Sequence, residues 1–271
     1  MVNPPLLPAS LRNASRDLLA CLRFFSRLPL PATSPDEDPP AAPDLSRLAP
    51  MVPVAGAVLG ALGALALGLA NALGLPPLVS AALAISVLVL ITGALHEDGL
   101  ADVADGFGGG RTRARKLEIM RDSRIGAFGA TALALSLMLR VAALAALAEH
   151  GRGAAALILV GAASRAFALL PLALLPPART DGLGAGAGRL DANGALVAGI
   201  VALFFAAVLG FGVLGLMRAI LALILALAAA LAMTRIARRQ IGGQTGDVAG
   251  AAQQLAEIAC LTGLLIGGHA A

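Results

Sequence analysis

Long apolar stretches are the feature that most constrains how this chain can fold. Each has about 17 to 25 residues, enough for a helix to cross roughly 30 Å of hydrocarbon. Hydrophobic residues make up 58% of the chain and charged residues only 13%, against about 25% in a typical soluble domain. The sequence therefore predicts an all-α, polytopic membrane helical bundle. About seven transmembrane helices are expected, at residues 51–71, 75–95, 126–148, 153–176, 194–216, 219–234 and 249–268.

The first 50 residues differ from the rest of the chain in mixing basic, apolar and Pro-rich sequence. Residues 11–28 alternate arginines with leucines, a pattern typical of an N-terminal amphipathic helix at the lipid interface. Residues 29–50 are dense in Pro and Asp and are expected to form a loop. We therefore expect a single integral membrane domain over 1–271, with a cytoplasmic amphipathic segment and loop in 1–50 and the bundle in 51–268.

Basic residues are distributed unevenly between the two sides of the predicted bundle. Residues 1–50, 96–125, 177–193 and 235–248 hold 16 of the 20 lysines and arginines. Such asymmetry indicates cytoplasmic loops, so we expect a multi-pass protein of the bacterial inner membrane with its active site on the cytoplasmic side. The net charge of +4 is explained by this topology. We expect membrane lipids, and no nucleic acid, as partners.

An acidic motif follows the second predicted span, beginning at His96 and Glu97. Asp98, Asp102 and Asp105 are spaced i, i+4 and i+7, which aligns three carboxylates on one side of a helix. Their repulsion is costly unless a cation binds there, and hard oxygen ligands favour Mg²⁺ or Mn²⁺ together with substrate phosphate oxygens. One of the three aspartates, or His96, is the candidate general base. The expected ligand is a phosphate ester or anhydride.

Two later segments extend this candidate site. Arg121 and Arg124 flank an acid and a hydroxyl group, which suits bidentate phosphate binding, with Asp122 as an orienting partner or further metal ligand. The glycine-rich segment 242–247 precedes the last span, where backbone N–H groups and a helix N-terminus favour an anion. Buried polar residues inside a membrane are candidates for function, although Arg140 is equally compatible with a structural role.

The candidate residues fall into three groups. The candidate catalytic residues are Asp98, Asp102, Asp105 and His96. The candidate metal ligands are Glu97, Asp98, Asp102, Asp105, Asp122 and Asp247. The candidate substrate-binding residues are Arg121, Ser123, Arg124, Arg165, Thr245, Gly246, Gln253, Gln254 and Glu257, with Arg165 expected to pair with Glu257 or to reach the cytoplasmic site.

Taken in order, these motifs resemble the cobalamin synthase family, the adenosylcobinamide-GDP ribazoletransferases. The matching segments are residues 23–29, 96–102, 105–106, 119–126, 245–247 and 251–257. The resemblance implies transfer of the adenosylcobinamide-phosphate group from adenosylcobinamide-GDP to α-ribazole or its 5′-phosphate, with release of GMP. It leaves open a homo-oligomer or a complex with other cobalamin-pathway enzymes. Val103 departs from the Thr often found in the family, without affecting the three aspartates.

Two other classes of membrane protein were weighed against this resemblance. A CDP-alcohol phosphotransferase also uses clustered aspartates with Mg²⁺, but it is expected to carry an Arg soon after the Ala of its motif, where Asp102 follows Ala101 here. A transporter or channel would use Arg140, Arg165 and Glu257 to line a path. Its main acidic motif is expected at the bilayer midplane, whereas the acids here gather in predicted cytoplasmic loops.

Overall fold

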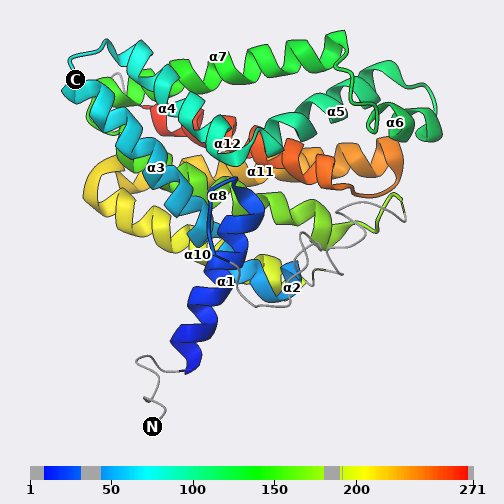
Figure 1. Ribbon diagram of the computed structural model, residues 1–271, viewed down its shortest axis with the longest axis horizontal. Coiled ribbons are helices and arrows are strands. Elements are labelled where there is room, and N and C mark those ends of the chain that lie inside the picture. The colour runs from blue at the N-terminus through cyan, green and yellow to red at the C-terminus, as the bar shows by residue number, and fades with distance from the viewer. Residues whose placement is uncertain (1–8, 32–43, 180–189, 191, 268–271) are drawn as a thin grey trace.

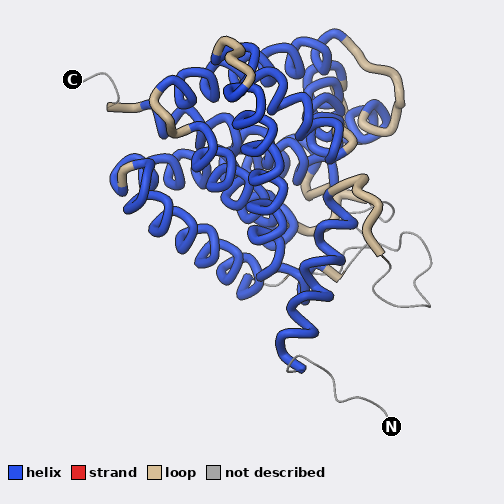
Figure 2. The backbone as a smooth tube through the Cα atoms, turned by 60° about the vertical axis from the view of Figure 1, so that its left-hand side comes forward, coloured by secondary structure: helices blue, strands red, loops and turns tan. Residues whose placement is uncertain are grey.

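The computed structural model describes residues 9–31, 44–179, 190 and 192–267, and these form a bundle of helices (Figures 1 and 2). The helices are α1 (Ala9–Phe25), α2 (Leu45–Leu48), α3 (Val52–Ala72), α4 (Pro77–Thr92), α5 (Leu95–Gly109), α6 (Arg113–Ile119), α7 (Ala127–Glu149), α8 (Gly153–Leu174), α10 (Ala192–Leu209), α11 (Leu216–Ile241) and α12 (Gly246–Leu265). A 3₁₀ turn lies at Ala49–Met51 and a π-helical turn at Gly210–Leu214.

The predicted all-α membrane bundle is confirmed. Among the described residues, six helices are long and apolar enough to cross a membrane, and the pair α4 and α5 makes a seventh candidate if both belong to one broken span. The two helices of that pair meet at 88°. At this corner Gly93 and Ala94 both have positive φ, of 64° and 58°, so the chain leaves the direction of α4 before the acidic helix begins. We treat α5 as lying outside the spanning helices.

Three local predictions need correction. The sixth span was predicted to end near residue 234, where the arginines begin, but α11 continues to Ile241, because a helix stops where its backbone turns rather than where its side chains become polar. That turn is Gly242, with φ of 69°. The predicted cytoplasmic segment 96–125 contains α5, in agreement with the helix assumed for the three aspartates, but also the short helix α6, which the sequence does not predict. The predicted loop 29–50 contains α2. Asp44 caps α2, since its side chain accepts hydrogen bonds from two backbone N–H groups.

Glycines allow α3 and α8 to pack with their backbones in close approach. A Cβ atom on Gly56 would lie 2.1 Å from the carbonyl oxygen of Gly161, and one on Gly60 would lie 2.2 Å from that of Leu157. Small residues four apart are a common device for bringing membrane helices together. This contact helps to make α8 one of the most enclosed helices, and its buried face includes Ser164 and Arg165.

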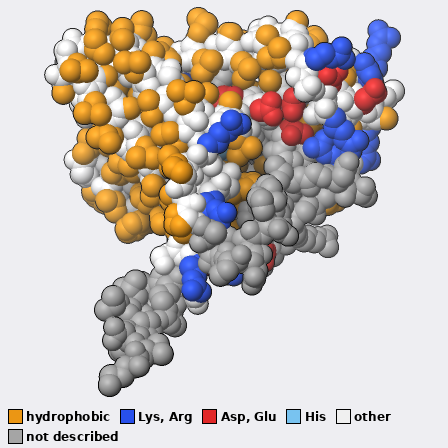
Figure 3. All heavy atoms as spheres, in the orientation of Figure 1, with side chains coloured by type: hydrophobic (Ala, Val, Ile, Leu, Met, Phe, Trp, Pro, Cys, Tyr) orange, Lys and Arg blue, Asp and Glu red, His pale blue; other side chains and the backbone are white. Residues whose placement is uncertain are grey.

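Charged side chains gather at one end of the molecule. In the view of Figure 3, acidic and basic side chains gather over the end where α5 and α6 are found. Further basic side chains lie near α1, and most of the other described surface in this view is hydrophobic. At this end Lys116 of α6 donates a hydrogen bond to Gln240 of α11. The backbone of Ala178, just after α8, bonds to Gln244 between α11 and α12. Segments far apart in the sequence therefore meet at the charged end.

Candidate functional site

The acidic helix α5 packs directly against the beginning of α12. A Cβ atom on Gly99 would lie 2.9 Å from the carbonyl oxygen of Asp247 and 3.2 Å from the Cα atom of Gly250, so only glycine permits this approach. Asp98 is exposed and Asp102 half-buried. Burial and the carboxylates of Asp98 and Asp247 raise the pKa of Asp102 to about 7. Carboxylates from two helices therefore share one electrostatic environment.

Asp105, the third aspartate of the motif, is engaged differently. It is buried, and its two carboxylate oxygens accept hydrogen bonds from the backbone N–H groups of Gly126, at 2.7 Å, and Gly129, at 2.9 Å. A Cβ atom on either glycine would lie within 2.4 Å of this carboxylate. Asp105 therefore joins α5 to the first turn of α7, where free N–H groups favour an anion.

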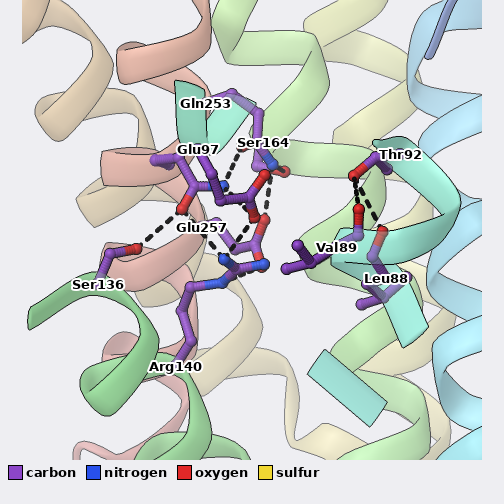
Figure 4. Close-up of polar contacts among 10 residues, drawn as sticks. Leu88, Val89, Thr92, Glu97, Ser136, Arg140, Ser164, Gln253 and Glu257 are labelled. Atoms are coloured by element: carbon purple, nitrogen blue, oxygen red, sulfur yellow. Dashed lines mark hydrogen bonds and ion pairs between the residues drawn. The ribbon is translucent and has the colours of Figure 1, made fainter. Parts of the chain in front are cut away.

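Glu97 faces the interior, in a buried polar cluster formed by α5, α7, α8 and α12 (Figure 4). Arg140 lies at the centre: its Nη1 donates to Glu97 Oε1 at 2.7 Å and its Nε to Glu257 Oε1 at 2.8 Å. Gln253 donates to Glu257 at 2.6 Å and to Ser164 at 3.0 Å. Gln254 donates to Glu97 at 3.2 Å. The cluster thus holds the acidic helix against three membrane helices.

Two predicted residues border this cluster. Arg165 lines the same small cavity as Glu257, but its guanidinium group donates a hydrogen bond to the carbonyl oxygen of Gly161 at 3.3 Å. The direct ion-pair partner of Glu257 is Arg140. His96 is buried, and its ring stacks on Phe25 of α1 with 5.8 Å between ring centroids. This stacking packs α5 against α1.

The segment 121–124 lies between α6 and α7 and is largely exposed. The guanidinium group of Arg124 forms two hydrogen bonds to the carboxylate of Asp122, Nη2 to Oδ2 at 2.6 Å and Nε to Oδ1 at 3.0 Å. These bonds from Arg124 lower the pKa of Asp122 to about 2. The carboxylate of Asp122 therefore holds the guanidinium group of Arg124 in place.

The glycine-rich connection 242–245 shapes the N-terminus of α12. Thr245 caps the helix by accepting a hydrogen bond from the N–H of Val248 at 3.2 Å, and its hydroxyl group donates to Asp247 Oδ2 at 3.1 Å. The same oxygen of Asp247 accepts a hydrogen bond from Nη2 of Arg179 at 3.3 Å. Arg179, in the segment after α8, therefore reaches a carboxylate at the beginning of α12.

Comparison with known proteins identifies the family to which the chain belongs. Residues 17–265 match the family described as cobalamin-5-phosphate synthase. This chain belongs to that family. A protein named adenosylcobinamide-GDP ribazoletransferase from Azorhizobium caulinodans is 55% identical over 92% of this chain and 95% of its own length. Proteins of the same name from Xanthobacter autotrophicus, 52% identical over 94% and 98%, and Mesorhizobium japonicum, 46% identical over 95% and 95%, are also similar. No solved structure matches the chain.

In this cobalamin-5-phosphate synthase family member, the predicted site residues separate into three places. The acidic face contains Asp98, Asp102, Thr245, Gly246 and Asp247. The interior cluster and its border contain His96, Glu97, Arg165, Gln253, Gln254 and Glu257. The exposed segment before α7 contains Arg121, Asp122, Ser123 and Arg124, beneath which Asp105 joins two helices. Family membership favours this assignment over the phosphotransferase and transporter alternatives.

The chemistry of the acidic face suits Mg²⁺, although the protein alone does not form a complete set of ligands. No group of three His, Cys, Asp or Glu residues in the described part of the chain is placed to hold a metal ion. Mg²⁺ is commonly bound by one or two carboxylates, with water and substrate phosphates completing its octahedron. Asp98 and Asp102 offer that donor type, and so does Asp247, whose contact with Arg179 is a single one at 3.3 Å. Glu97 and Asp122 form closer ion pairs with arginines, at 2.7 Å and 2.6 Å.

Two arginines acquire importance only from the structure. Arg140 was expected to be compatible with a structural role, and the structure gives it two glutamate partners from different helices. Arg179 was counted only among the topology-determining basic residues. Two signals are present in the sequence: Arg140 is a membrane-embedded cation that needs balancing charge, and Arg179 lies two residues after Pro177 at the end of a span. Neither signal identifies a partner, because the partners are 43 to 117 residues away along the chain.

Proposed function

We propose that this chain is an adenosylcobinamide-GDP ribazoletransferase, the transferase that completes cobalamin. It joins adenosylcobinamide-GDP to α-ribazole or its 5′-phosphate, forming adenosylcobalamin or its phosphate and GMP. The proposal follows from 55% identity to a protein of that name over nearly the whole chain. Its structural support is the close approach of α5 to the beginning of α12. This approach brings the carboxylates of α5 near Asp247, which also contacts Arg179.

The reaction forms one phosphorus–oxygen bond and breaks another. The 3′-hydroxyl oxygen of the ribazole attacks the phosphorus atom on the cobinamide side, the bond to GMP breaks, and GMP leaves with that bridging oxygen. A carboxylate of Asp98 or Asp102 accepts the hydroxyl proton. Arg179, with Arg121 and Arg124, is suited to holding phosphate oxygens, because a guanidinium group donates several parallel hydrogen bonds.

A divalent cation fits the same face. One or two of the carboxylates of Asp98, Asp102 and Asp247 would hold Mg²⁺, with Mn²⁺ as its substitute, together with water and phosphate oxygens. A bound cation would neutralise charge on the diphosphate. Asp105 is left out of this set because both of its oxygens accept backbone hydrogen bonds. The residues of the interior cluster are proposed to hold α5 in position rather than to contact substrate.

The reaction is proposed to occur at the cytoplasmic face of the bacterial inner membrane, within one membrane domain. Three of the four basic segments predicted to lie inside, 96–125, 177–193 and 235–248, are in contact at the charged end of the bundle through Arg113, Lys116, Ala178, Gln240 and Gln244. A soluble nucleotide-linked substrate is available on that side, while the apolar helices contact lipid. Association with a second copy or with other enzymes of the pathway stays a prediction.

The test is GMP release by the purified protein in lipid, given Mg²⁺, adenosylcobinamide-GDP and α-ribazole 5′-phosphate. Wild type is expected to release GMP together with a cobalamin product. Asp98→Asn should lower the rate at least about 100-fold, in line with the loss of one group that stabilises transition-state charge. Glu149→Gln, an exposed acid at the other end of α7, is the matched control and should retain the rate. Absence of GMP release by folded wild-type protein would contradict the proposal.

A further inference from the structure

The segment after α8 is fixed against the connection that precedes α12. The N–H of Gln244 donates to the carbonyl oxygen of Pro176 at 2.9 Å, and the N–H of Ala178 donates to the carbonyl oxygen of Gln244 at 2.8 Å. Gly243 is needed there, since a Cβ atom would lie 2.4 Å from the oxygen of Pro176. Arg113 of α6 adds a hydrogen bond to the carbonyl oxygen of Ala178 at 3.1 Å. The backbone beside Arg179 is therefore held by two elements, the connection before α12 and helix α6.

The side chain of Arg179 is less completely engaged than its backbone. Its Nη2 is 3.3 Å from Asp247 Oδ2, a single long contact with an oxygen that also accepts from Thr245. Its Nη1 is buried without a hydrogen-bond partner among the described residues. Since a guanidinium group commonly binds a carboxylate or phosphate through two parallel hydrogen bonds, this pair leaves donor capacity unused.

The position of Arg179 also sets it in competition with a cation. Asp247 is one of the three carboxylates that suit Mg²⁺, and the guanidinium group of Arg179 contacts its Oδ2. A cation bound to that carboxylate would therefore meet a positive charge. Without a bound cation, the guanidinium group of Arg179 balances part of the negative charge of these carboxylates. When a cation and a diphosphate are both present, the diphosphate offers more negative charge and more acceptor oxygens than Asp247 does.

We propose that Arg179 exchanges partners during binding: it pairs with Asp247 in the free protein and moves to a phosphate oxygen of the nucleotide-linked substrate, leaving Asp247 to the divalent cation. Arg179 is then a substrate-binding residue whose departure completes the cation site. The inference rests on the proposed function, because it assumes a diphosphate substrate and a cation at this face. It predicts that cation and substrate strengthen each other's binding, a coupling that must be reciprocal.

The exchange gives Arg179→Met two effects of opposite sign. The variant should bind Mn²⁺ more tightly than wild type when no substrate is present, because Asp247 is freed. It should bind adenosylcobinamide-GDP about 10- to 100-fold more weakly in the presence of Mn²⁺, the range for loss of a charge-assisted hydrogen bond of roughly 1.5 to 3 kcal/mol. Arg179→Lys should keep Mn²⁺ affinity near that of wild type and recover part of the substrate affinity.

Mn²⁺ binding is measured by electron paramagnetic resonance and substrate binding by calorimetry, with the full chain in lipid nanodiscs. Arg111→Met is the matched control, because it removes an exposed positive charge from the segment between α5 and α6 and should change neither affinity by more than about twofold. Wild type supplies a measurement that needs no variant of Arg179: adenosylcobinamide-GDP should lower the Kd of Mn²⁺.

Two results would overturn the exchange: an unchanged substrate Kd in Arg179→Met, or weaker Mn²⁺ binding by that variant without substrate. Absence of coupling in wild type would overturn it as well. The proposed function fails differently, through Mn²⁺ binding that Asp98→Asn does not alter or through absence of substrate binding by wild type. An Mn²⁺ site that depends on Asp98, together with an unchanged substrate Kd in Arg179→Met, would reject the exchange and leave the proposed function standing.

Discussion

Arg140 shows how one residue can determine the energetics of a membrane-embedded site. It lies between Glu97 and Glu257, and all three side chains are less than a tenth exposed. Desolvating such charges is costly, and their pairing with each other and with Gln253 and Gln254 offsets that cost. The cluster therefore fixes the position of α5 only as long as every charge keeps its partner.

Replacing Arg140 by Met should leave two buried carboxylates, Glu97 and Glu257, without their direct ion-pair partner. We expect the free energy of unfolding to fall by about 3 to 5 kcal/mol, the usual cost of breaking a buried ion pair from one side. Reversible unfolding in mixed detergent measures this loss. In a double-mutant cycle, Glu257→Gln combined with Arg140→Met should cost less than the sum of the two single changes. Strictly additive costs would show that the pair contributes no coupling.

At the scale of helices, apolar sequence predicts well where spans lie and poorly where polar helices begin. The span predicted at 126–148 is α7, one residue further along at each end, because Gly126 begins the apolar run and also precedes the first helical residue. The short helix α6 was missed, since its seven residues are rich in Arg and Lys and carry no hydropathy signal. Its N-cap is Thr112, whose side chain accepts a hydrogen bond from the backbone N–H of Arg115, a contact that the sequence alone does not show.

The contact between α3 and α8 yields a prediction about a single methyl group. Gly60→Ala should destabilise the bundle by about 1 to 3 kcal/mol, because the added Cβ would overlap the carbonyl oxygen of Leu157 and force the helices apart. Gly68→Ala is the matched control in the same helix, where a Cβ would have no neighbour within 4 Å. Thermal unfolding in detergent compares the two variants. Equal melting temperatures would show that α3 and α8 do not need this close approach.

For the whole molecule, the candidate site is assembled where connections between helices meet. The asymmetry of basic residues predicts that these connections share one side, and Ala178, Gln244 and Arg113 do lie in contact there. Sequence reasoning also identified the acids of α5 and Asp247. It did not show that Asp98 is exposed while Asp105 accepts backbone hydrogen bonds. The i, i+7 spacing places both on one side of α5, but their environments depend on α7 and α12, which are distant in the sequence.

The orientation of the bundle is testable at the two ends of α7. Ser123 precedes this helix at the charged end, and Glu149 is its last residue; both are exposed, whereas the native Cys21 and Cys260 are buried. A cysteine at Ser123 should react with a membrane-impermeant maleimide in inverted vesicles and not in intact spheroplasts, because basic loops stay in the cytoplasm. A cysteine at Glu149 should show the opposite pattern. Labelling of the Ser123 position from outside intact spheroplasts would place the acidic face, and the reaction proposed for it, in the periplasm.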